Sequence, residues 1–195
     1  MLVPDSVSVP DATTIDGGAT LDLTGAGSIA NSKVQDNGGT FDISGHTGGA
    51  SIVSLSGSGA ATLGAHTLTL SSASGTFSGA IGGTGGLTVA AGTETLSGTN
   101  TYSGATTISG TLDLTGTGSI ANSSVQDNGG TFDISGHTGA VSIVTVPEPD
   151  RLLIEAPPVW PEISRVPLSA TDELAIEPVP VRSSWAPLSI VVVPE

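Results

Sequence analysis

The chain has 195 residues, with 28 Gly, 12 Pro, no Cys, four Lys and Arg together and a formal net charge of −14. The lack of Cys excludes a disulfide scaffold and a thiolate metal site. So few basic side chains argue against a nucleic-acid partner and against binding to anionic lipid headgroups.

Gly and Pro occupy different parts of the chain. All 28 Gly lie between Gly17 and Gly139, whereas ten of the 12 Pro lie at or after Pro147. Pro at this density excludes helices and central strands, so we expect the end of the chain to be a linker, or alternatively a cap built from Trp160, Trp185 and the apolar run 188–193. The predicted organisation is a lead-in at 1–14, a repeat region at 15–145 and a Pro-rich acidic tail at 146–195.

The chain begins Met1-Leu2-Val3-Pro4-Asp5, without the basic segment and apolar stretch of a secretory signal. This start predicts either an intracellular protein or a chain whose beginning is missing. No run approaches the roughly 18 apolar residues of a membrane span, so we expect no direct membrane span in this chain.

A long internal repeat follows. Residues 20–53 recur at residues 111–144, a displacement of 91 residues, and 30 of the 34 positions are identical. Such near-identity over a fixed displacement indicates a duplicated structural module.

Pairs of apolar residues mark a finer period. Each pair encloses one residue, as in Leu21-Asp22-Leu23, which is the alternation of a strand with one buried face. Successive pairs are 20, 27, 19, 25 and 20 residues apart, which predicts a step of about 23 residues. The pairs are Leu21/Leu23, Phe41/Ile43, Leu68/Leu70, Leu87/Val89, Leu112/Leu114 and Phe132/Ile134.

Gly-rich turns such as Asp36-Asn37-Gly38-Gly39 separate these pairs, and no stretch before residue 145 keeps a helical periodicity. Short strands with such turns fit either a meander of hairpins or a β-solenoid. A hairpin sandwich usually buries many aromatic residues, which are scarce here, whereas a solenoid needs only a narrow stack of aliphatic side chains. We therefore predict an all-β parallel solenoid of about six coils, roughly 30 Å long.

Residues 79–112 carry an ordered series of motifs: Gly85-Gly86-Leu87-Thr88, then 100–104 (NTYSG) and the closing 110–112 (GTL). With its surroundings, roughly residues 15–145, this series resembles the autotransporter-associated β-strand repeat of bacterial type V secreted passengers. The resemblance implies a right-handed parallel β-helix at the cell surface that acts as a stalk, adhesin or carrier.

Such passengers usually carry an export signal and a membrane β-barrel. This sequence shows neither, so we expect a fragment, a truncated copy or a module that is used elsewhere.

Four acidic residues are candidates for chemistry: Asp22, Asp42, Asp113 and Asp133. Each lies between two inward apolar residues and is therefore predicted to face outward. Stacked carboxylates could pair for acid catalysis or collect cations. The favoured interpretation is that they keep a strand face soluble.

The remaining candidates also favour a structural role. His46 and His137 are copies of each other in Ser-Gly-His-Thr-Gly turns, and His66 lies in another turn. The run that begins at Gly82 resembles a calcium-binding nonapeptide, but Leu87 stands where the ligand Asp would be. We therefore predict no catalytic residue, no cofactor site and no metal site.

The sequence thus predicts a structural or adhesive β-helix module and no enzyme. The expected place is the bacterial cell surface or the extracellular space, with a missing translocator in the outer membrane. The expected partners are a host surface, a glycan or neighbouring surface molecules. Two alternatives stay open: a polysaccharide-active β-helix enzyme and a segment of a phage tail spike or fibre.

Overall fold

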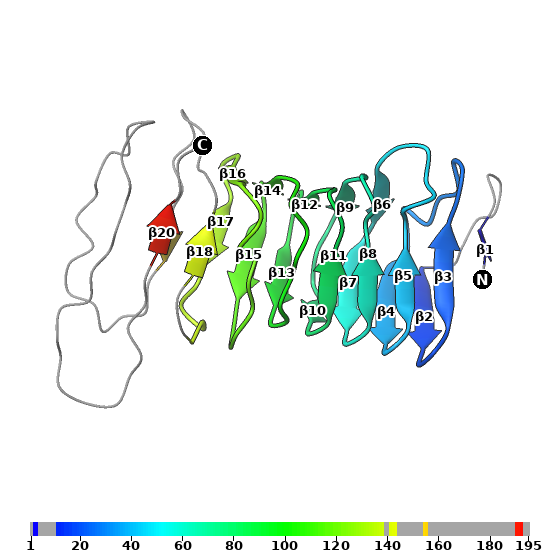
Figure 1. The fold of residues 1–195 in the computed structure, drawn as a ribbon, viewed down its shortest axis with the longest axis horizontal. Coiled ribbons are helices and arrows are strands. Elements are labelled where there is room, and N and C mark those ends of the chain that lie inside the picture. The colour runs from blue at the N-terminus through cyan, green and yellow to red at the C-terminus, as the bar shows by residue number, and fades with distance from the viewer. Residues whose placement is uncertain (1, 4–10, 139–140, 144–153, 156–189, 193–195) are drawn as a thin grey trace, which may run out of the picture.

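The computed structural model describes residues 2–3, 11–138, 141–143, 154–155 and 190–192. This part of the chain is a parallel β-solenoid of about six coils, and it contains no helix (Figure 1). Consecutive strands turn into different sheets and pair with strands one coil away, so the solenoid is confirmed and the hairpin meander is not.

Three sheets form the faces of the solenoid, and the strands of each sheet are parallel. The first sheet contains β1 (Leu2–Val3), β3 (Thr20–Leu23), β5 (Thr40–Asp42), β8 (Ala60–Thr62) and β11 (Ala80–Gly82). The long sheet contains β2 (Ala12–Asp16), β4 (Lys33–Asn37), β7 (Ser54–Gly57), β10 (Thr76–Phe77), β13 (Thr93–Leu96), β15 (Thr111–Leu114), β17 (Thr131–Asp133) and β19 (Ile154–Glu155). The third sheet contains β6 (Ala50–Ile52), β9 (Leu68–Leu70), β12 (Leu87–Val89), β14 (Thr106–Ile108) and β16 (Val125–Asp127).

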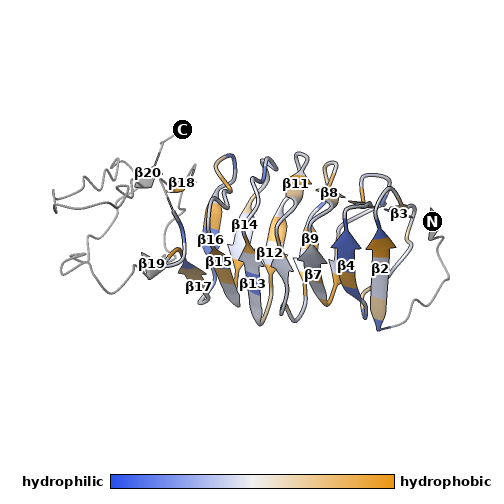
Figure 2. Ribbon diagram, turned by 90° about the horizontal axis from the view of Figure 1, so that it is seen from below, coloured by the Kyte–Doolittle hydropathy of each residue, from blue (hydrophilic) through white to orange (hydrophobic). Residues whose placement is uncertain are grey.

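The core is a narrow stack of aliphatic and a few aromatic side chains. All twelve residues of the apolar pairs are buried, with no more than 3% of their surface exposed. In Figure 2, hydrophobic residues recur along the strands from coil to coil. The alternation seen in the sequence therefore places every second residue of a strand inside the solenoid.

One coil is shorter than the sequence predicted. Paired residues in neighbouring strands of the solenoid are 18 to 22 positions apart, as in Leu87↔Leu68 and Phe132↔Ile154. Two apolar pairs in the same sheet are therefore 19 or 20 residues apart, whereas the intervals of 27 and 25 arise where the next pair lies in a different sheet. The predicted step of about 23 residues was therefore an average over two kinds of interval, those of one whole coil and those that pass to a different sheet.

The two copies of the repeat occupy different faces. β3 and β5 lie in the first sheet, but their copies β15 and β17 lie in the long sheet, and the copy of β4 is β16 in the third sheet. At about 20 residues per coil, 91 residues make about four and two-thirds turns rather than a whole number. The second copy is thus rotated by one face around the axis.

A loop replaces the strand that would follow β11 in the first sheet. Within it, Asn100 accepts a hydrogen bond from the backbone N–H of Ile81 (2.9 Å) and donates to the carbonyls of Gly98 (3.1 Å) and Ser119 (3.0 Å). Asn100 thereby links three successive coils. These bonds satisfy backbone groups that a strand would otherwise pair.

Both ends of the repeat region have described strands. β2 starts at Ala12, three residues before the expected boundary. Most of the tail, with Trp160 and Trp185, lies outside the described residues. Of the tail, β19 pairs with β17, and β20 (Ile190–Val192) pairs with β18 (Val141–Ile143).

Candidate functional site

The four candidate aspartates form two neighbouring pairs. Asp22 lies directly opposite Asp42 in the first sheet, and Asp113 lies directly opposite Asp133 in the long sheet. All four are half-buried between fully buried neighbours, which confirms that they face outward. The two pairs lie on different faces because the copies are rotated, so the four carboxylates do not gather in one place.

The contacts of these aspartates are structural. Asp42 and Asp133 each accept a hydrogen bond from a backbone N–H two residues later, that of Ser44 (2.8 Å) and of Ser135 (2.7 Å). Such bonds end a strand in a tight turn. Burial, and to a smaller extent the charge of Asp133, raises the pKa of Asp113.

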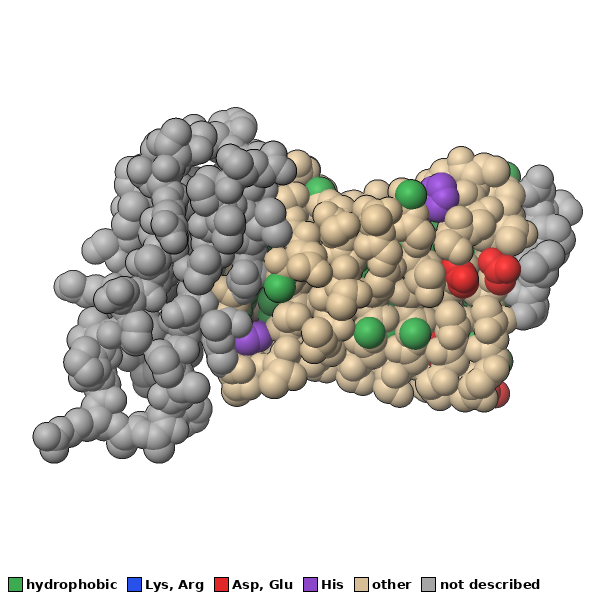
Figure 3. Space-filling model, in the orientation of Figure 1, with side chains coloured by type: hydrophobic (Ala, Val, Ile, Leu, Met, Phe, Trp, Pro, Cys, Tyr) green, Lys and Arg blue, Asp and Glu red, His purple; other side chains and the backbone are tan. Residues whose placement is uncertain are grey.

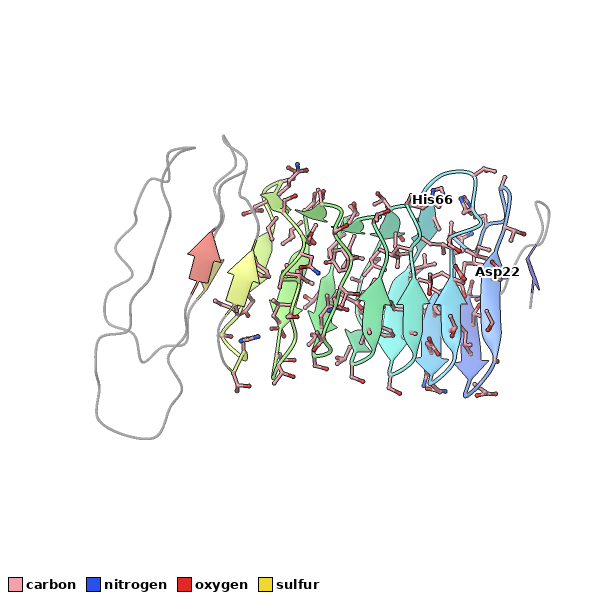
Figure 4. All side chains as sticks on the ribbon, in the orientation of Figure 1. Asp22 and His66 are labelled. Atoms are coloured by element: carbon pink, nitrogen blue, oxygen red, sulfur yellow. The ribbon has the colours of Figure 1, made fainter. Side chains whose placement is uncertain are left out.

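The face in Figure 3 carries mostly neutral polar side chains and backbone, with acidic groups near the N-terminal end. Figure 4 shows Asp22 on β3, well separated from His66. His66 is half-buried in the turn between β8 and β9. The structure brings none of the three His beside an outward aspartate pair to form an acid–base constellation within hydrogen-bond reach.

His46 and His137 tie neighbouring coils together. The Nε2 atom of His46 lies 2.9 Å from the carbonyl oxygen of Gly27, and that of His137 lies 2.7 Å from the carbonyl oxygen of Gly118. A ring nitrogen that faces a carbonyl carries the proton, so both rings donate. The Nδ1 atom of His46 lies 3.0 Å from the carbonyl oxygen and 3.1 Å from the backbone nitrogen of Gly48; in a neutral ring whose Nε2 carries the proton, Nδ1 accepts from that N–H. The duplicated histidines thus hold the same pair of loops in both copies.

A cavity of about 260 Å³ lies beside His46. Its walls are small or apolar, and it contains no carboxylate. The lining residues are Leu23, Ala26, Gly27, Ser28, Ile29, His46, Gly49, Ala50 and Ser51. Both ring nitrogens of His46 already contact backbone groups, so this side chain presents no free nitrogen to the cavity.

Leu87 stands where a calcium-binding nonapeptide would have its ligand Asp, and its side chain lies in the core. Leu87 is fully buried in β12, so the sixth place of the nonapeptide-like run contributes an inward methyl group instead of an oxygen ligand. Among the described residues, no group of three His, Cys, Asp or Glu is placed to hold a metal ion. The same residues include no long apolar helix of the kind that crosses a bilayer.

Two buried aspartates were missed by the sequence analysis. Asp36 and its copy Asp127 face inward, and each accepts a hydrogen bond from a backbone N–H three residues later, that of Gly39 or of Gly130, at 2.7 Å. Burial raises the pKa of Asp36, while the backbone at Gly39 and Ala60 lowers it less. The alternation with inward Val34 could have identified Asp36, but the Asp-Asn-Gly-Gly sequence was interpreted only as a turn.

Replacing Asp36 with Ala is expected to lower the free energy of unfolding by about 1–3 kcal/mol, because it leaves the buried N–H of Gly39 without an acceptor. Urea unfolding measures the change. Asp36→Asn retains a side-chain oxygen and is the matched control, with a smaller loss. Equal stability of Asp36→Ala and the wild type would contradict this role.

Glu94 is a third buried acid that was missed. It is fully buried in β13, and neither carboxyl oxygen makes a hydrogen bond. Burial raises its pKa from 4.5 to about 8, and the nearby backbone of Gly75 and of Leu55 offsets only part of this effect. Its alternation with inward Leu96 is the signal that could have found it.

Comparison with known proteins adds no assignment, because no protein-family model, no curated protein and no solved structure matches this chain.

Proposed function

We propose that this chain is a structural or adhesive β-helix module of a bacterial surface-exposed or secreted autotransporter-like protein. The observation that carries the proposal is the continuous solenoid, in which buried side chains stack through every coil and the strands turn polar residues outward. A solenoid of this kind acts through its length and its repeated faces. The motifs at 85–88 and 100–104 support the autotransporter-like assignment.

The arrangement of the polar groups supports a role without catalysis. Acid catalysis needs an acid and a base within reach of one substrate atom. Here the two aspartate pairs lie on different faces, and the cavity beside His46 contains neither pair. We therefore propose that the polar surface binds rather than reacts.

A row of polar side chains along the third sheet supports a neutral glycan as partner. The outward positions of its five strands are in register from coil to coil and are all half-buried. Hydroxyl groups at this regular spacing can share hydrogen bonds with the hydroxyls of a sugar chain. The row consists of Ser51, Thr69, Thr88, Thr107 and Gln126.

Retention of neutral polysaccharides on the immobilised full chain tests this proposal. The triple variant Thr69→Val, Thr88→Val and Thr107→Val keeps the side-chain shape but removes three hydroxyls, and we expect it to weaken retention about tenfold or more. Thr62→Val together with Thr76→Val, on the other two sheets, is the matched control and should retain the polysaccharide normally.

Other outcomes would change the assignment. Polysaccharide cleavage that is lost in Asp42→Asn or Asp133→Asn would replace the proposal with the β-helix enzyme. A stable trimer of the full chain in light scattering would favour the tail-spike or fibre alternative. Absence of retention on every polysaccharide and every cell surface tested would contradict the adhesive role.

A further inference from the structure

Glu94 places its carboxyl group in the core column of the long sheet. The pairing of β10 with β13 places Glu94 beside Gly75, and the pairing of β13 with β15 places it opposite Leu112. Gly75 contributes no side chain to this column, and a Cβ atom there would collide with the backbone of Leu55. The carboxyl group of Glu94 is therefore buried with no hydrogen-bond partner on either oxygen.

Within the described part of the chain, the one Lys or Arg side chain is that of Lys33, which is exposed on β4, so none faces Glu94. The paired elements are β10 (Thr76–Phe77) and β15, and the sheet continues through β7 (Ser54–Gly57). The titratable side chain on these elements is Asp113, which faces outward and is itself acidic. The buried position is thus compatible with a neutral carboxyl group and unfavourable for a carboxylate.

The backbone ladder is narrowest between β7 and β10, the strand next to that of Glu94. One residue pair, Phe77↔Gly57, joins β10 to β7, whereas two pairs join β10 to β13 and the bridge Ala73↔Gly92 extends that ladder. By contrast, five pairs join β2 to β4 and four join β13 to β15. Glu94 therefore lies on the strand that pairs with β10, which has only two residues.

We propose that Glu94 is a proton-controlled latch in the middle of the solenoid: the neutral carboxyl group keeps β7, β10 and β13 closed, and its ionisation opens the ladder between them. The pKa of about 8 gives the direction of the effect. Because the folded state holds the proton more tightly than the unfolded chain, the stabilisation is complete below about pH 4.5 and is lost as the pH rises to about 8.

Urea unfolding of the full chain at several pH values tests the latch. From about pH 5 to about pH 9, we expect the unfolding equilibrium constant of the wild type to rise several hundred-fold more than that of Glu94→Gln, which cannot ionise. Asp113→Asn, on the neighbouring strand but facing outward, is the matched control and should keep the wild-type pH dependence. Glu94→Leu serves as a second non-ionisable variant if the Gln variant does not fold.

Hydrogen exchange locates the opening. After correction for the intrinsic effect of pH on exchange, the amides of residues 54–57, 76–77 and 93–96 should lose protection at high pH before those of β4 do. The same pH dependence in the wild type and in a folded non-ionisable variant would overturn the latch. Uniform loss of protection along the wild-type solenoid would overturn it as well, because ionisation would then act on the whole fold.

Discussion

Tyr102→Ala is expected to lower the free energy of unfolding by about 3–5 kcal/mol, because it empties the core where a strand of the first sheet is replaced by a loop. Tyr102 is the largest fully buried side chain of the solenoid. Its hydroxyl lies 2.7 Å from that of Thr106, which lies 2.7 Å from that of Ser123. Ser123 in turn donates to the carbonyl of Gly104 at 2.6 Å.

The conservative variant separates packing from hydrogen bonding. Tyr102→Phe keeps the ring and the Thr106–Ser123 bond, so its expected loss is about 1 kcal/mol. Thermal and urea unfolding of the two variants measure both values. Equal losses would contradict the packing argument, since the ring would then contribute little beyond its hydroxyl.

The same hydroxyl pair occurs in the first copy, and it shows what sequence analysis could have found. Thr13 and Ser32 lie 2.7 Å apart, in the places that Thr106 and Ser123 occupy in the second copy. The four residues that begin at Ala12 (ATTI) recur at residue 105, but displaced by 93 instead of 91 residues. Four residues (16–19) separate this segment from the longer repeat in the first copy, but only two (109–110) do so in the second. A search at a fixed displacement of 91 residues therefore misses the match.

The strands were predictable because apolar residues on both sides of one polar residue leave few alternatives to an inward pair. The sheet to which each strand belongs was not, because Leu21 and its copy Leu112 have the same neighbours in the sequence and yet lie on different faces. A face is defined by counting residues around a coil. That count depends on loops such as 97–105, whose lengths carry no apolar alternation.

The buried acids were unpredictable for a related reason. Asp36 fits inside the solenoid because a glycine on the neighbouring coil leaves room for it: a Cβ at Gly59 would overlap the carboxyl group of Asp36. Glu94 likewise lies beside a glycine, Gly75, in the register of β10 and β13. These glycines are 23 and 19 positions away in the sequence. Only the register between coils relates each acid to the glycine beside it.

Insertion of a third repeat unit is expected to lengthen the solenoid without unfolding it. A second copy of residues 20–110, placed after Gly110, recreates the native junction, because Thr20 begins the same sequence as Thr111. At about 20 residues per coil and ~4.8 Å between strands, the insert adds about four and two-thirds coils and about 22 Å of length. Small-angle X-ray scattering measures the increase in the maximum dimension.

The expected success follows from the rotation between the present copies. Residues 20–43 and their copy at 111–134 bury the same side chains although they lie on different faces. The third copy should therefore rotate by one further face and bury these side chains again. Leu68→Lys and Leu87→Lys within the insert provide a control of equal length, because two buried charges prevent stacking. If the native insert added no more length than this control, the faces would not be interchangeable, and the rotated second copy would depend on contacts particular to its own place in the solenoid.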